Sequence, residues 1–98
     1  MTCHFLKIAP EWFGPVVSRE KTFEIRRHDR DFKVWDKLVL MEYADGAYTG
    51  RYAISQVDCI VTHEMFPDGI AEGYCVMGIF KDTHGPEMKA ILRKHAAG

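Results

Sequence analysis

The chain has 98 residues, a length that predicts one domain over residues 1–98 and leaves little room for a second hydrophobic core. Its formal net charge of −1 argues against a protein that coats nucleic acid through a general basic excess. No apolar run approaches the length of a membrane-spanning helix and no secretory signal opens the chain, so a cytoplasmic protein without a membrane partner is expected.

The first third of the chain predicts a strand, a short helix and a second strand. Residues 4–8 (HFLKI) are mostly apolar, which suits a strand that is buried on at least one face. Pro10 stops this strand and suits the first turn of a helix, in which apolar residues recur at helical spacing from residue 12 to 17. Residues 22–28 (TFEIRRH) alternate between apolar and polar side chains, which indicates the second strand.

The remainder predicts three further strands and a final helix. Residues 37–43 form a strand, and Asp45-Gly46 is typical of the hairpin turn that follows it. The return strand covers residues 51–62, with one bulge expected where its alternation breaks. Residues 74–80 are almost continuously apolar, as in an interior strand, and a helix with a narrow apolar stripe is expected over residues 86–95.

This order of elements predicts an α+β fold. Five strands in so short a chain must curl, and a small, mostly antiparallel five-stranded β-barrel closes its own edges. We therefore expect a barrel with a short helix after the first strand and a second helix at the C-terminus.

Three charged side chains gather in one short stretch and form the first candidate site. Glu24 and Arg26 are two residues apart and therefore share one face of the second strand, and Lys21 directly precedes this strand. The two cations could hold an anionic group while Glu24 accepts hydrogen bonds from amino or hydroxyl groups. The alternative is a surface ion pair, which contributes less than about 1 kcal/mol.

Residues 19–26 (REKTFEIR) resemble the signature of the ASCH family, a part of the PUA-like superfamily. The resemblance extends over residues 4–80, to a small branch of bacterial and phage proteins with the motifs HELKI, KTFEIR, NDRDF and VGD. These correspond to residues 4–8, 21–26, 28–32 and 34–36. Two residues depart from the pattern, because Arg19 stands where the ASCH signature has glycine and Trp35 stands where the branch has the glycine of VGD. If those glycines adopt a positive φ, Arg19 strains its turn or narrows the cleft.

The resemblance implies a PUA-like barrel in which a cleft beside the first helix holds RNA or a nucleotide-like small molecule. Such a module would use Lys21, Arg26, Lys7 and Arg30 for phosphate and Glu24 for a base edge. An aromatic residue would stack on the base, with Trp12, Tyr52 and Tyr74 as candidates and Tyr74 favoured. For each of these aromatic residues, packing in the core or at its rim is the alternative.

Two other functions stay open at this point. Some ASCH members are amidohydrolases that act on acetylated cytidine, which would make Lys21 and Glu24 catalytic, although Glu24 stands where those enzymes have threonine. The chain could also be a protein-interaction module of a phage or mobile element, with Met65, Phe66 and Ile70 as its exposed face.

Neither a metal ion nor a cofactor is expected. The three cysteines, Cys3, Cys59 and Cys75, are widely spaced in apolar segments, which favours reduced and buried thiols. No paired spacing such as CxxC or HxxxH is present.

Overall fold

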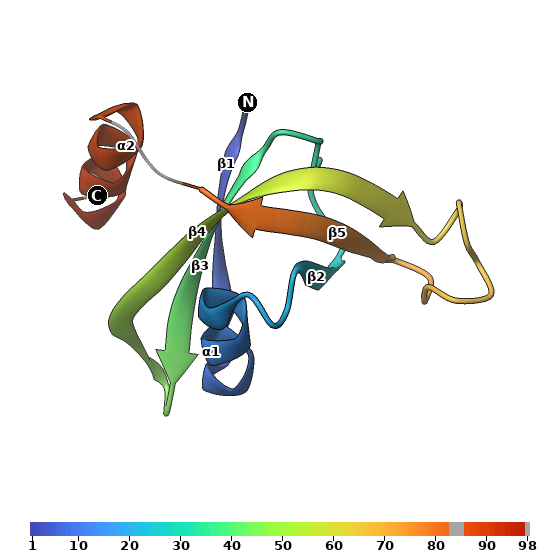
Figure 1. Cartoon of the computed structure of the whole chain (residues 1–98), viewed down its shortest axis with the longest axis horizontal. Helices are drawn as coiled ribbons and strands as arrows, with labels where there is room; N and C mark the ends of the chain where they lie inside the picture. Colours follow the sequence, from blue (N-terminus) through green and yellow to red (C-terminus); the bar gives the residue numbers. More distant parts are fainter. Residues whose placement is uncertain (83–85, 98) are drawn as a thin grey trace.

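Five strands form one curled sheet in the computed structural model of this protein, which describes residues 1–82 and 86–97 (Figure 1). The strands are β1 (Cys3–Ile8), β2 (Phe23–Arg27), β3 (Lys37–Ala44), β4 (Ala47–Thr62) and β5 (Tyr74–Lys81). The helices are α1 (Pro10–Ser18), between β1 and β2, and α2 (Pro86–Ala97), after β5. The order of elements predicted from the sequence is therefore confirmed.

The sheet is curled but its two ends are not joined. Its strand order is β1-β3-β4-β5-β2, in which β1 runs parallel to β3 and every other pair is antiparallel. The α+β class and the mostly antiparallel five-stranded sheet are thus as predicted, whereas closure into a full barrel is not confirmed. Because β1 and β2 are the end strands, each leaves one edge without a strand partner in the described part of the chain.

The core lies on the inner face of the curl, where α1 covers it. Leu38, Leu40 and Met77 are completely buried there, and α1 adds Phe13 and Val16. This packing fixes α1 beside β3 and β4. The candidate site follows directly in the chain, with Lys21 between α1 and β2 and with Glu24 and Arg26 on β2.

One turn and one bulge explain where β4 begins and where its register changes. Asp45 and Gly46 have φ angles of 52° and 81°, as a two-residue hairpin turn requires, and β4 begins directly after them at Ala47, four residues before the expected start. The register of β4 against β5 shifts between Val57 and Cys59, which confirms the expected bulge. The bulge interrupts the alternation of β4, and as a result Cys59 is exposed and not buried as expected.

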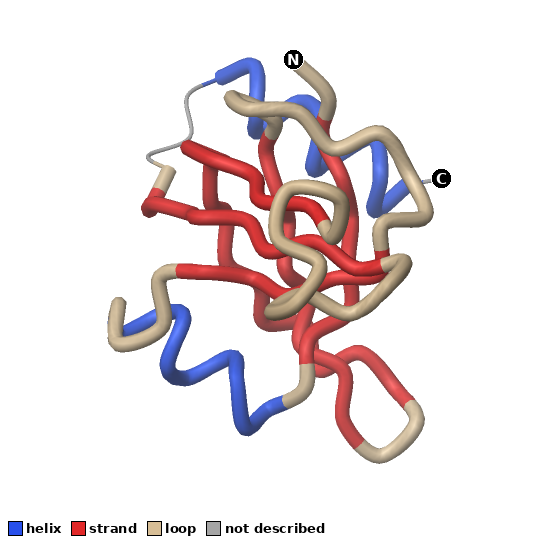
Figure 2. Tube along the Cα trace, turned by 90° about the vertical axis from the view of Figure 1, so that its right-hand side faces the viewer, coloured by secondary structure: helices blue, strands red, loops and turns tan. Residues whose placement is uncertain are grey.

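Helix α2 packs on the outer face of the sheet, at the opposite end from α1 (Figure 2). Ile91 and Leu92 contact the small apolar cluster around Val39 and Ile54. The His95 ring stacks on Phe5 with 3.7 Å between ring centroids. Neither helix, within residues 1–82 and 86–97, has the length and apolar character needed to cross a membrane.

Candidate functional site

Strand β2 turns its polar face inward and its apolar face outward. Glu24 pairs in register with Met77 of β5 and is only 3% exposed, whereas Phe23 and Ile25 are 41% and 58% exposed. An ordinary edge strand would bury the apolar pair, so this reversal places a carboxylate against the core. A carboxylate at such a site requires cationic partners.

Lys21 and Arg26 supply those partners. The Lys21 Nζ donates to Glu24 Oε1 at 2.6 Å, and the Arg26 Nε donates to Glu24 Oε2 at 2.8 Å. Lys21 also donates to the backbone carbonyl of Phe23 at 2.6 Å. The three side chains therefore meet as one cluster in which a single carboxylate bridges two cations.

A cleft opens above this cluster. It has a volume of ≈ 450 Å³ and lies between the end of β1, the first turn of α1 and β2. Besides the cluster, its lining includes Lys7 and Trp12, and the Trp12 side chain is 51% exposed. The cleft thus combines three cations and one carboxylate with an accessible aromatic surface.

Not all of the other predicted ligand-binding residues line the cleft. Lys7 lines it, whereas Arg30 lines a neighbouring hollow that also includes Lys7 and Arg26. Tyr74 lines neither of them; its hydroxyl accepts a hydrogen bond of 3.2 Å from Arg27. Tyr52, the third aromatic candidate, lines a separate pocket.

Of the three aromatic candidates, Trp12 is the one that the fold brings to the cleft, whose lining also includes Phe23. The sequence placed it in the first turn of a helix that starts directly after β1, and the structure places that turn beside the cleft. The feature of the sequence that could have identified Trp12 as a cleft residue is therefore Pro10, which fixes the start of α1 close to the end of β1.

Arg19 and Trp35, which stand where the sequences that this chain resembles have glycine, both have a positive φ, 72° at Arg19 and 78° at Trp35. Arg19 ends α1 in the left-handed conformation, and two residues later the Lys21 N–H donates to the Pro15 carbonyl at 3.0 Å. Arg19 does not line the cleft, because its guanidinium donates to the Ile79 carbonyl at 3.2 Å. The departure from glycine therefore strains the turn and does not narrow the cleft.

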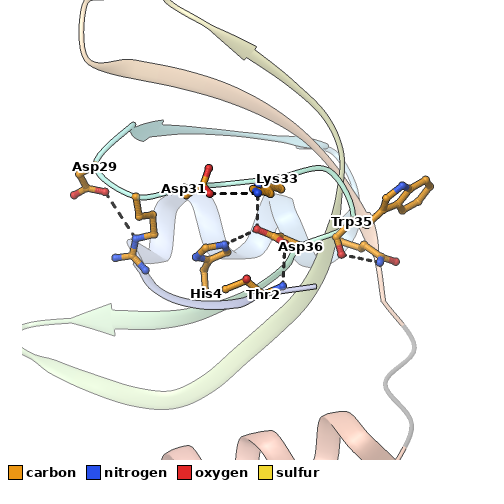
Figure 3. Close-up of polar contacts among 9 residues, drawn as sticks. Thr2, His4, Asp29, Asp31, Lys33, Trp35 and Asp36 are labelled. Carbon is orange, nitrogen blue, oxygen red and sulfur yellow. Dashed lines mark hydrogen bonds and ion pairs between the residues drawn. The ribbon is translucent and has the colours of Figure 1, made fainter.

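A second buried carboxylate, Asp36, fixes the loop that follows β2 (Figure 3). It accepts hydrogen bonds from the Thr2 N–H at 2.9 Å, the His4 Nε2 at 2.8 Å and the Lys33 N–H at 3.0 Å. Burial raises the pKa of Asp36, but these three hydrogen bonds outweigh burial and hold its pKa below the ordinary value. Asp36 thus joins the loop that carries Arg30 to the strand that carries Lys7.

The remaining candidate groups offer less chemistry. Within residues 1–82 and 86–97 no three His, Cys, Asp or Glu side chains are placed to hold a metal ion. Burial raises the pKa of the Cys3 and Cys75 thiols, so both are protonated at neutral pH. In the loop between β4 and β5, Met65 and Phe66 are exposed but Ile70 is only 9% exposed, so the three do not form one exposed patch.

Comparison with known proteins places the chain in a family without assigning an activity. The 12.9 kDa protein of Escherichia phage P2 called "Uncharacterized 12.9 kDa protein in GpA 3'region" is 35% identical to it over 48 residues. This match spans 49% of the chain and 44% of the phage protein. A family model described as "Domain of unknown function (DUF3850)" matches residues 3–79. The chain therefore belongs to the DUF3850 family.

Proposed function

We propose that this protein is a binding module for RNA or a nucleotide-like ligand, which it holds in the cleft over Lys21, Glu24 and Arg26. The observation that carries the proposal is the buried Glu24 carboxylate, bridged by two cations at the base of an open cleft whose rim carries Trp12. Burying these charges costs free energy, which a purely structural strand would avoid by placing apolar residues there.

Each part of a nucleotide has a matching group in the cleft. The Trp12 indole offers a face on which a base can stack. Arg26 uses its Nε for Glu24, which leaves its two terminal nitrogens to meet a phosphate together with Lys7. Each Glu24 oxygen accepts one hydrogen bond within the cluster and can accept another from an amino group of the ligand.

The same geometry gives less support to an amidohydrolase reaction. In the ASCH enzymes that the sequence resembles, the position of Glu24 is a threonine, and here that carboxylate is engaged by both cations. The Lys21 ammonium donates to two acceptors, which leaves it poorly placed as a base. Turnover is therefore the alternative outcome of the binding experiment below.

We also propose that the DUF3850 family is a branch of the ASCH/PUA-like superfamily. Support comes from the stretch of residues 19–26, from the curled five-stranded sheet and from the position of α1 beside the cleft. The glycine position of the signature, at Arg19, also falls on a residue with a positive φ, as does the VGD glycine position of the branch, at Trp35.

A titration of ribonucleotides, modified nucleosides and short RNAs tests the proposal. Wild type is compared with Lys21→Ala, Glu24→Gln and Arg26→Ala, while chromatography of the ligand reports any product. Lys33→Ala is the matched control, because it removes an exposed cation that does not line the cleft.

Saturable binding in wild type and in Lys33→Ala, weakened at least tenfold in the cleft variants, supports the module. Circular dichroism of each variant establishes that it is folded. Equal binding by all variants would place the ligand elsewhere, and turnover that disappears in Lys21→Ala would favour the amidohydrolase.

A further inference from the structure

A second hollow adjoins the cleft, on the side of the loop that follows β2. It has a volume of ≈ 360 Å³, and its lining includes Arg27, Arg30 and Tyr48. Lys7 and Arg26 line both hollows, which therefore share a wall. Both hollows are lined by residues of β1 and β2, the two end strands of the sheet.

Two cations of the second hollow lie over aromatic rings. Lys7 Nζ is 4.3 Å from the centroid of the Tyr43 ring, and the Arg27 guanidinium carbon is 5.1 Å from that of Tyr74. Such contacts hold a cation in place without cancelling its charge. Tyr74, predicted to stack on a base, thus lies where it positions Arg27.

One carboxylate, Asp29, lines the second hollow together with its four cations. Its Oδ1 lies 3.8 Å from the Arg30 Nε, and the two side chains are 58% and 43% exposed. An exposed ion pair at this distance contributes little to the stability of the fold, and its attraction is screened by salt. The hollow therefore keeps a clear positive excess, which suits an anionic ligand.

We propose that the two hollows form one site for a single-stranded nucleic acid of at least two linked nucleotides. This inference rests on the proposed function and extends it from a nucleotide to a strand. The first base stacks on Trp12, the linking phosphate meets Lys7 and Arg26, and the second nucleotide occupies the hollow beside Tyr48.

The order of groups across the two hollows carries this inference. An aromatic residue lines each hollow, and the cations common to both lie where they meet, as a base–phosphate–base ligand requires. Tyr48 is 53% exposed and packs edge to face with Tyr43, with 5.0 Å between ring centroids. Each hollow has a volume within the range of small-ligand pockets.

Calorimetric titration with a nucleoside monophosphate, the corresponding dinucleotide and a tetranucleotide tests this inference, with RNA and DNA strands in parallel. Wild type, Arg27→Ala and Tyr48→Ala are compared, and Lys33→Ala is again the control. The measured quantity is the ratio of dinucleotide to mononucleotide affinity, which isolates the second hollow from the first.

We expect this ratio to be at least about tenfold in wild type and in Lys33→Ala, as one further stacked base provides. In Arg27→Ala and Tyr48→Ala it should fall toward one, because both residues line the second hollow and not the first. Equal affinity for mononucleotide and dinucleotide would overturn the strand site and leave the proposed function intact. Absence of binding by every ligand would overturn both, and a difference between RNA and DNA would identify the sugar.

Discussion

Replacing Asp36 by Asn is predicted to destabilise the protein strongly while changing hardly any volume. The carboxylate accepts three hydrogen bonds of 2.8 to 3.0 Å. An amide has one acceptor oxygen, so it keeps at most the two bonds made to Oδ2 and places an NH₂ against the Thr2 N–H.

The magnitude follows from these contacts. Hydrogen bonds to a charged group contribute about 1.5 to 3 kcal/mol each, and bonds to a neutral group about 1 kcal/mol. Losing one hydrogen bond and weakening two lowers the free energy of unfolding by about 3 kcal/mol, which is a large part of the total stability of a small domain. Asp31→Asn in the same loop is the control, because the Asp31 side chain is 81% exposed.

Urea unfolding followed by circular dichroism measures the effect, at neutral pH and again in acid. Because the pKa of Asp36 is depressed in the folded state, its contribution is complete above the ordinary value of 3.8 and is lost as the pH falls through the folded value. The difference between wild type and Asp36→Asn should therefore be largest at neutral pH and shrink below about pH 4. A neutral-pH difference below about 0.5 kcal/mol would refute the reasoning.

Further predictions concern the cleft and the two strained residues. Trp12→Ala should weaken nucleotide binding by about tenfold in a calorimetric titration, because base stacking is worth about 1 to 3 kcal/mol, while unfolding stays near wild type; unchanged affinity would remove Trp12 from the site. At Arg19 and at Trp35 the Gly variant should be more stable than the Ala variant by about 1 kcal/mol in urea unfolding, since both positions have a positive φ. An Ala variant as stable as the Gly variant would show that the backbone carries no strain there.

Local patterns were sufficient to predict which elements the chain forms. Alternation identified β2, and Asp45-Gly46 identified the hairpin between β3 and β4, because both depend on neighbouring residues. The shared face of Glu24 and Arg26 follows from the same period of two.

Features that depend on distant residues could not be predicted in this way. Alternation separates the two faces of β2 but does not reveal that Glu24 faces the core, which depends on pairing with β5. Asp36 contacts His4 across 32 positions of the sequence. Tyr74 begins a strand as expected, yet it pairs in register with Arg27, whose guanidinium lies over its ring, and it does not line the cleft.

An NMR titration of the labelled protein with a nucleoside monophosphate tests the central claim most directly, because backbone amide shifts report where the ligand binds. The account predicts saturable shifts concentrated in residues 7–9, 12, 21 and 23–26, which line the cleft. Shifts concentrated in residues 63–71 would contradict it, and so would the absence of any shift with the ligand in large excess.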